Sequence, residues 1–122
     1  MTEAKRRRRV LIVEDEPALR LSYQWAFQPK YHLAFASTGA EAMEQLELQR
    51  PDVAVLDMRL PDTDGVELLR RIRSSEPDLP VIITTAYMSI EPQLKVLNLP
   101  HSGYIVKPFR LDELGARIDA VS

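Results

Sequence analysis

The chain has no cysteine among its 122 residues, and it has only two histidines. Without cysteine it has no disulfide, no thiolate nucleophile and no zinc site built on thiolates. The histidines, His32 and His101, cannot form a histidine metal site alone, and we expect both on the surface. Chemistry based on sulfur or on a histidine cluster is therefore excluded.

Long apolar runs and an excess of one charge are missing as well. No stretch approaches the roughly 18 to 20 apolar residues of a membrane span, and no signal-peptide apolar region follows Arg6 to Arg9. Sixteen Lys and Arg against eighteen Asp and Glu give a net charge of -2. This balance creates no field that would favour nucleic acid or an anionic membrane. We expect a cytoplasmic protein with no membrane partner and no direct nucleic acid contact by this domain.

The length suits one compact domain. We expect residues 1–9 to form a basic, poorly ordered lead-in, read as a solvated tail, and residues 10–122 to form the domain. Short apolar runs alternate with amphipathic stretches, which is typical of a parallel sheet with crossover helices. The expected central strands are β-branched and the flanking strands more mixed; together these are Val10 to Val13, Leu33 to Ala36, Val53 to Leu56, Val81 to Thr84 and Tyr104 to Val106.

Helical spacing of apolar residues marks the connections between these strands. The buried stripes expected are Ala42, Met43 and Leu46; Val66, Leu69 and Ile72; and Leu111, Leu114, Ile118 and Val121. Ser37 or Thr38 can cap the second of these helices. Trp25 and Phe27 are read as core or partner-facing residues of the first. The sequence therefore predicts an α/β fold of the (βα)5 class.

Polar residues follow four of the strands, where open α/β sheets bind their ligands. Glu14 and Asp15 follow the first strand, Asp57 the third, Thr85 the fourth and Lys107 the fifth. Three clustered carboxylates repel one another unless a cation lies between them, and hard oxygen ligands suit Mg²⁺. We therefore expect a magnesium site at this edge of the sheet.

Asp57 then becomes a phosphate acceptor. Mg²⁺ would neutralise an incoming phosphoryl group, and Lys107 and Thr85 could donate to its oxygens. The product would be an aspartyl phosphate. Taken singly, each residue has a plain structural reading: a helix cap for Glu14 and Asp15, a turn residue or a surface charge for the others. The four strand ends taken together favour the site.

The motifs that carry these residues resemble the receiver family of two-component response regulators across essentially the whole chain. They are Val10 to Glu16, Leu56 to Gly65, Thr85-Ala86-Tyr87 and Lys107-Pro108-Phe109. The resemblance implies a doubly wound, flavodoxin-like three-layer sandwich with five parallel strands in the order 2-1-3-4-5. It also implies a signalling switch rather than a metabolic enzyme, with self-catalysed phosphoryl transfer and slow autodephosphorylation only.

The same resemblance assigns roles to individual residues. Asp57 would take its phosphate from a phosphohistidine on a sensor kinase or phosphotransfer protein. Asp15, Asp57 and the main-chain carbonyl of Arg59 would bind Mg²⁺, or Mn²⁺ in its place, with Glu14 helping through water. Thr85 and Tyr104 would switch conformation, although Tyr104 could simply pack on an edge strand. We also expect Arg59 and Tyr87 to slow dephosphorylation by crowding the attacking water.

The face expected to signal to partners is formed by the fourth helix, the fifth strand and the fifth helix. Two departures from the family pattern lie on this output face. Pro92 fits only the first turn of a helix, and Pro100-His101 stands where the family has Gly-Ala. Homodimerisation through that face is therefore left open. The chain could be a stand-alone receiver or the N-terminal part of a transcriptional regulator with an effector domain.

Three other classes fit less well. A haloacid-dehalogenase-like phosphatase needs an acid two positions after its nucleophile, where this chain has Arg59. A flavodoxin-like carrier needs a hydroxyl- and glycine-rich loop after the first strand, where this chain has Glu14-Asp15-Glu16. A degenerate receiver would lack one of the signature residues, and all five are present.

Overall fold

The computed structural model describes residues 7–86 and 102–121. Within the described residues there are five parallel strands, and a helix follows the first, second, third and fifth of them. The strands are β1 (Arg9–Val13), β2 (His32–Ala36), β3 (Val53–Asp57), β4 (Val81–Thr85) and β5 (Ser102–Val106). The helices are α1 (Pro17–Phe27), α2 (Gly39–Leu48), α3 (Gly65–Ser75) and α5 (Leu111–Ala120).

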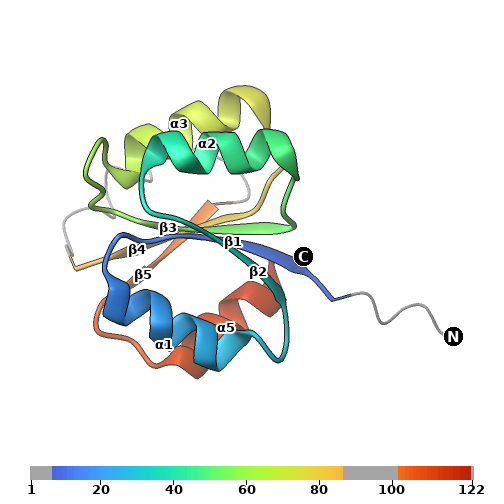
Figure 1. The fold of residues 1–122 in the computed structure, drawn as a ribbon, viewed down its shortest axis with the longest axis vertical. Coiled ribbons are helices and arrows are strands. Elements are labelled where there is room, and N and C mark those ends of the chain that lie inside the picture. Colours follow the sequence, from blue (N-terminus) through green and yellow to red (C-terminus); the bar gives the residue numbers. More distant parts are fainter. Residues whose placement is uncertain (1–6, 87–101, 122) are drawn as a thin grey trace, which may run out of the picture.

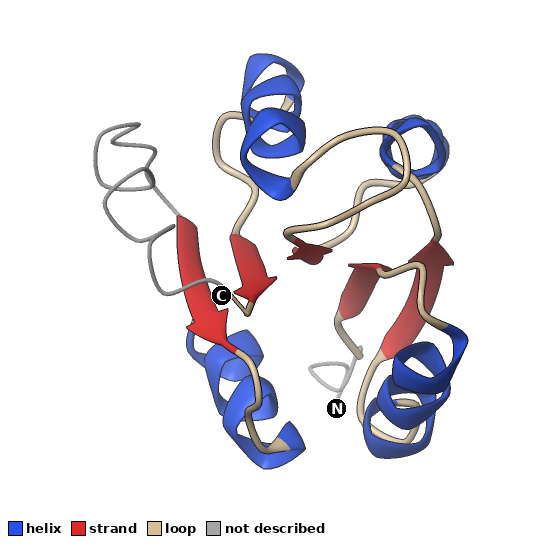
Figure 2. Ribbon diagram, turned by 90° about the vertical axis from the view of Figure 1, so that its left-hand side faces the viewer, coloured by secondary structure: helices blue, strands red, loops and turns tan. Residues whose placement is uncertain are grey.

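The strands pair in the order β2-β1-β3-β4-β5, as predicted. Helices α2 and α3 cover one face of the sheet, and α1 and α5 cover the other (Figure 1). The side view shows the same three layers (Figure 2). The predicted doubly wound α/β sandwich is confirmed.

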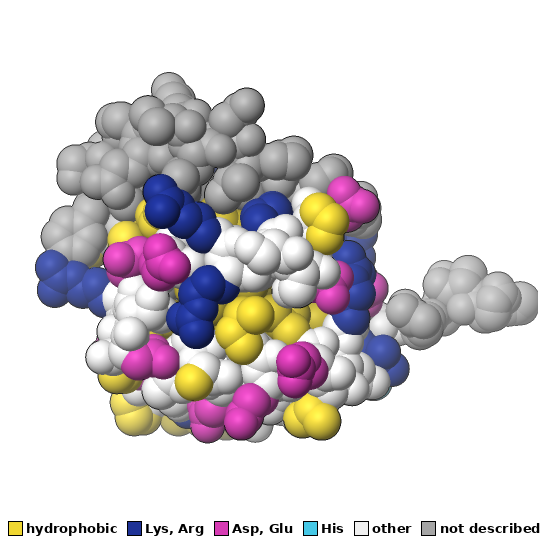
Figure 3. All heavy atoms as spheres, turned by 90° about the horizontal axis from the view of Figure 1, so that it is seen from above, with side chains coloured by type: hydrophobic (Ala, Val, Ile, Leu, Met, Phe, Trp, Pro, Cys, Tyr) yellow, Lys and Arg dark blue, Asp and Glu magenta, His cyan; other side chains and the backbone are white. Residues whose placement is uncertain are grey.

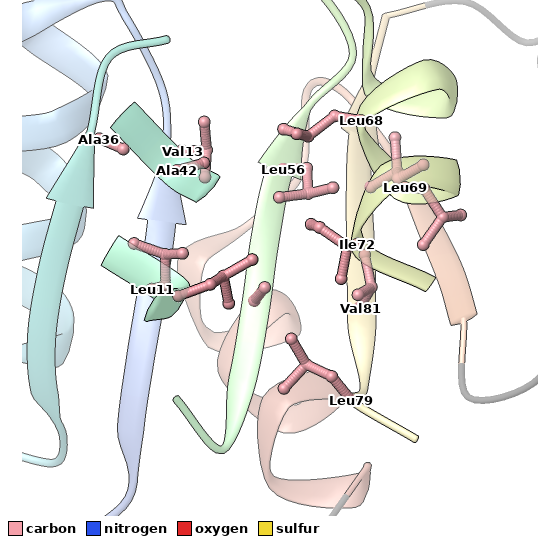
Figure 4. Packing of buried hydrophobic residues seen from close by; sticks show 13 residues of the cluster. Leu11, Val13, Ala36, Ala42, Leu56, Leu68, Leu69, Ile72, Leu79 and Val81 are labelled. Atoms are coloured by element: carbon pink, nitrogen blue, oxygen red, sulfur yellow. The ribbon is translucent and has the colours of Figure 1, made fainter. Parts of the chain in front are cut away.

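Two apolar clusters hold the layers together, one on each face of the sheet, because successive strand residues point to opposite faces. The cluster under α2 and α3 includes Leu11, Leu56 and Ile83, with Leu69 and Ile72 from α3 (Figure 4). The predicted α2 stripe is present here through Ala42, Leu46 and the half-buried Met43. Leu68 of α3 is fully buried beside Leu69 although it was not predicted. A helix face wider than a simple stripe explains the addition.

The second cluster lies under α1 and α5. Ile12, Val55 and Ile105 supply the sheet side, and Leu114 and Ile118 of α5 are fully buried against it. From α1 and the turn after it come three aromatic side chains, Tyr23, Phe27 and Tyr31, which pack in sequence with ring centroids 6.2 Å and 5.8 Å apart. Trp25, in contrast, is 78% exposed, so only Phe27 of the predicted pair belongs to the core.

The N-terminal boundary differs from the expectation. β1 begins at Arg9, which pairs with His32 of β2. The Arg9 amide also donates to Asp52 Oδ2 at 2.8 Å, and its carbonyl accepts from the Asp52 amide at 2.8 Å. Arg7 and Arg8 also bind: their guanidinium groups donate to the main-chain carbonyls of Tyr31 and Ile118, at 3.3 Å and 2.7 Å. Residues 7–9, within the stretch 1–9 expected as a lead-in, are thus bonded to the domain. The expected fourth helix, Pro92, Pro100 and His101 lie outside the described residues.

The described surface mixes charges of both signs. On the face over α2 and α3, basic and acidic side chains alternate around small apolar patches (Figure 3). His32 is exposed, as predicted. Among the described residues, no helix is long and apolar enough to cross a membrane.

Candidate functional site

Three carboxylates meet where β1 and β3 end. Glu14 and Asp15 directly follow β1, and Asp57 is the last residue of β3. Each offers an oxygen lying within 4.8 Å of the oxygens of the other two. Glu14 and Asp57 are buried, at 2% and 8% exposure, while Asp15 is exposed to solvent. Parallel pairing of β1 with β3 explains the meeting, because it brings the same ends of both strands together.

A lysine ammonium from the residue that follows the edge strand β5 faces this cluster. Lys107 Nζ lies 3.1 Å from Asp57 Oδ1 and 3.7 Å from Glu14 Oε1. Its main-chain amide donates to the carbonyl of Thr85 at 2.6 Å, which fixes Lys107 just beyond the end of β5. The structure thus brings four of the predicted residues together: Glu14, Asp15, Asp57 and Lys107.

Glu14 has an unfavourable environment for its charge. Burial raises the pKa of its carboxyl, the neighbouring Asp57 carboxylate raises it further, and the Lys107 ammonium lowers it. Glu14 Oε2 accepts from the Glu16 amide at 3.2 Å, but the buried Oε1 has no hydrogen-bond partner in the described structure. A buried acceptor left unpaired costs stability. A divalent cation with oxygen ligands would relieve this arrangement, so the residues present fit such an ion.

The loop after Asp57 is closed by its own main chain. Met58 donates to the carbonyl of Thr84 at 2.9 Å, and its carbonyl accepts from the Gly65 amide at 2.7 Å. Gly65 lies so near that a Cβ there would stand 3.0 Å from Met58 Cα and 3.2 Å from the Asp57 carbonyl oxygen. A side chain at residue 65 would require these main-chain atoms to give way by a few tenths of an ångström. The strand carrying Asp57 and the start of α3 are therefore locked together.

The same loop is also attached to α2. Asp62 accepts from the amides of Gly39 and Ala40, at 2.8 Å and 3.0 Å, and these bonds lower the pKa of its carboxyl. Thr38 completes the cap of this helix by accepting from the Glu41 amide at 3.0 Å, as the sequence predicted. Asp62 itself was not singled out, because its partners lie more than twenty positions away.

The remaining predicted residues occupy more varied positions. Thr85 is fully buried at the end of β4. Tyr104, in β5, is half-buried against the cluster under α2 and α3, which places its side chain on the opposite face from Ile105. Arg59 is exposed and forms an isolated bridge with Asp64 across the loop. Tyr87 lies outside the described residues.

Two buried polar residues near the site were missed. Thr84 is paired with Asp57 in the sheet register and is 1% exposed. Tyr23 is 1% exposed, and its hydroxyl has no hydrogen-bond partner in the described structure. The charges of Glu14 and Asp57 add to burial in raising the pKa of Tyr23. The sequence signal was a hydroxyl group, that of Thr84 or Tyr23, at a position of its strand or helix that faces the core.

A doubly wound parallel sheet whose strand ends carry three carboxylates and a lysine defines a class of small α/β regulatory domains. The sequence model of the response regulator receiver domain matches residues 10–119. The chain therefore belongs to the response regulator receiver family of two-component systems, which is a family of regulatory domains.

Individual relatives agree with this assignment. The chain is 39% identical to the response regulator MprA of Mycobacterium leprae over 93% of its own length and 50% of that protein. It thus spans about half the length of the curated relatives it matches. Among solved structures it is similar to the non-phosphorylated HemR receiver domain of Leptospira biflexa, with a TM-score of 0.83, 34% identity and 94% of both chains covered. The chemotaxis response regulator CheY4 of Vibrio cholerae has a TM-score of 0.85 at 26% identity, with 96% of this chain and 100% of that chain covered.

Proposed function

We propose that this chain is a phosphorylation-dependent switch that accepts a phosphoryl group on Asp57 from the phosphohistidine of a partner kinase or phosphotransfer protein. The contact that carries the proposal is the 3.1 Å approach of Lys107 Nζ to Asp57 Oδ1 beside two further carboxylates. An ion pair on the surface can form without further carboxylates beside it. An acceptor carboxylate that must receive a dianionic phosphoryl group needs both a fixed cation and ligands for a second cation.

In the transfer step, an oxygen of the Asp57 carboxylate attacks the phosphorus atom. The bond from phosphorus to the histidine nitrogen breaks, and the electron pair leaves with the imidazole. Lys107 neutralises charge on the transferred oxygens, and the Thr85 hydroxyl becomes a donor to them. The chain promotes only the transfer to its own Asp57, once for each phosphoryl group. It therefore acts as a regulatory domain rather than as an enzyme with turnover.

Glu14, Asp15, Asp57 and the main-chain carbonyl of Arg59 would hold a Mg²⁺ or Mn²⁺ ion. When bound, the ion supplies positive charge for the incoming phosphoryl oxygens. Glu14 Oε1 supports this assignment, because it is buried, has no hydrogen bond in the described structure and is compensated only by the Lys107 ammonium at 3.7 Å. We propose Arg59 and Tyr87 as the residues that slow hydrolysis of the aspartyl phosphate by crowding the path of water.

Phosphorylation would act by shifting a balance between two conformers. Thr85 and Tyr104 are proposed as the switch residues, and the readout as the face that contains β5 and α5. A shift from 1:99 to 99:1 needs about 5.5 kcal/mol of differential interaction. Because the curated relatives are about twice as long, we infer that the switch operates within a cytoplasmic transcriptional regulator and controls an effector domain.

Mass spectrometry after incubation with acetyl phosphate and Mg²⁺ tests the acceptor. The wild-type chain should gain about 80 Da, the mass of one phosphoryl group. Asp57→Asn should gain nothing, and chelation of Mg²⁺ should abolish the gain in the wild type. Asp64→Asn, in the same loop but serving as the cap of α3, is the matched control and should still be modified. Equal modification of Asp57→Asn and wild type would refute the assignment.

A further inference from the structure

The loop that follows Asp57 is attached to a helix from another part of the chain. Residues 58–64 contribute Asp62, whose two carboxylate oxygens each accept one amide of the first turn of α2, from Gly39 at 2.8 Å and from Ala40 at 3.0 Å. A pair of charge-assisted bonds at a helix N-terminus is strong and directional. The loop is therefore fixed at its midpoint as well as at its two ends.

Helix α2 is itself held in place relative to the carboxylates. Its inner face, through Ala42 and Leu46, is buried in the core. Just before the helix, the carbonyl of Ala36 accepts from the Glu14 amide at 2.9 Å. A path of bonds thus leads from Glu14 through the end of β2 and the start of α2 to Asp62, in the loop that follows Asp57.

The contact between loop and helix is also sterically close. A Cβ at Gly39 would stand 2.7 Å from Thr63 Cγ2 and 3.4 Å from Asp62 Oδ1. Real Cβ atoms do not approach other atoms to 2.7 Å, so a side chain at residue 39 would require the Thr63 side chain to turn or the loop to move. Gly39 is buried and therefore cannot relieve the contact by moving into solvent.

We propose that Asp62 is a positioning residue for the cation site: by binding the Gly39 and Ala40 amides, it holds the loop so that the carbonyl of Arg59 faces the carboxylate cluster. The inference rests on the proposed function, because it assumes that the cluster binds Mg²⁺. It adds a residue that acts through the loop and touches neither the ion nor the phosphoryl group. Groups that orient ligands from outside commonly change metal affinity by about tenfold or more.

The competing explanation is that Asp62 only caps α2. Thr38 provides the matched control, because its hydroxyl caps the same turn by accepting from the Glu41 amide and has no bond to the loop. If capping were the whole role, Thr38→Ala and Asp62→Ala would have similar effects on every property. If Asp62 positions the loop, only its removal should weaken Mg²⁺ binding.

Calorimetric titration of Mg²⁺ into the 122-residue chain separates these outcomes. We expect about tenfold weaker binding for Asp62→Ala and less than about twofold change for Thr38→Ala. Asp62→Asn keeps the size and one acceptor oxygen, so its affinity should be intermediate. Equal affinities of Asp62→Ala and the wild type, or equal losses in Asp62→Ala and Thr38→Ala, would overturn the inference.

A second pair of variants tests the same contact without removing the carboxylate. Gly39→Ala should weaken Mg²⁺ binding, and adding Thr63→Ser should restore it, because serine lacks the Cγ2 methyl group that the new Cβ would meet. Failure of Thr63→Ser to restore binding would contradict the proposal, and it would do so even if Asp62→Ala did not fold. Absence of Mg²⁺ binding by the wild type would refute the proposed function, and the inference with it.

Discussion

Lys107 Nζ lies 3.1 Å from Asp57 Oδ1 although the two residues are 50 positions apart. Replacing Lys107 by Met leaves two buried carboxylates without their nearest cation. In the absence of Mg²⁺ we expect the free energy of unfolding to fall by about 1 to 3 kcal/mol, with part of the loss recovered in excess Mg²⁺. The rate of phosphorylation by acetyl phosphate should fall by about a hundredfold or more.

Urea unfolding with and without Mg²⁺ measures the first effect. Lys30→Met is the control, because Lys30 pairs with Asp119 at 3.3 Å with both side chains more than half exposed. Such a pair contributes at most about 1 kcal/mol and has no link to the metal. An equal response of both variants to Mg²⁺ would contradict the placement of Lys107 at the site.

Glu14 predicts a pH dependence of stability. The folded chain raises the pKa of this carboxyl above its ordinary value of 4.5, so the stability it contributes is full below 4.5 and is lost as pH rises through the folded pKa. Without Mg²⁺, Glu14→Gln should therefore unfold at higher urea concentration than the wild type at pH 7. The difference should disappear as pH falls towards 4.5.

Excess Mg²⁺ should change this order at pH 7. The wild type gains stability from the ion in proportion to its affinity, and the glutamine variant binds the ion more weakly. Urea midpoints of both proteins across pH, with and without Mg²⁺, provide the comparison. If the urea midpoints of the two metal-free proteins differed by the same amount at every pH, the charge of Glu14 would not lower the stability of the folded chain.

Gly65 predicts a steric effect on the site. A Cβ there would press on Met58 Cα at 3.0 Å and on the Asp57 carbonyl, and main-chain atoms cannot turn aside. We expect Gly65→Ala to lower the free energy of unfolding by about 1 to 3 kcal/mol and to slow phosphorylation. Gly103→Ala is the control, because its Cβ would meet nothing within 4 Å. Similar losses in both variants would point to a general intolerance of alanine instead.

Tyr31 and Asp119 predict an effect at the opposite edge of the sheet. The Tyr31 hydroxyl donates to Asp119 Oδ1 at 2.5 Å, and this bond is the main cause of the lowered pKa of Asp119. Stability from this carboxylate is present above its ordinary pKa of 3.8 and is lost as pH falls through the lowered value. At pH 7, Tyr31→Phe should cost about 1 kcal/mol, given the exposure of Asp119.

The cost of Tyr31→Phe should shrink when Asp119 becomes protonated, which thermal unfolding between pH 7 and pH 2.5 can follow. Tyr23→Phe makes the same chemical change where the hydroxyl has no hydrogen-bond partner in the described structure. It should therefore be neutral or stabilising. A loss as large as that of Tyr31→Phe would reveal a partner for the Tyr23 hydroxyl.

Patterns of local sequence were sufficient for the strands and for the charged residues that gather at their ends. β-branched runs mark strands buried on both faces, and parallel pairing then forces Asp57 and Lys107 towards the same edge. The start of β1 was misplaced by one residue because it depends on the pairing of Arg9 with His32 and on Asp52, whose carboxylate accepts the Arg9 amide. The residues next to Arg9 in the sequence do not indicate its contact with Asp52.

Contacts between distant segments were the ones that escaped prediction. Asp62 reads as an ordinary turn residue, and only the folded chain brings it to Gly39. Tyr23 reads as one apolar position among several, yet its hydroxyl lies in a core where the charges of Glu14 and Asp57 reach it. Such relations depend on the packing of whole elements, and periodicity contains no information about them.

Lys107 comes from the segment after β5, the last strand to be synthesised, whereas the carboxylates follow β1 and β3. A chain shortened before β5 would therefore contain all three carboxylates and lack the ammonium that faces Glu14 and Asp57. Such a shortened chain would keep the mutual repulsion of the carboxylates without the ammonium that offsets it, so β5 matters for the electrostatic balance of the site as well as for the edge of the sheet.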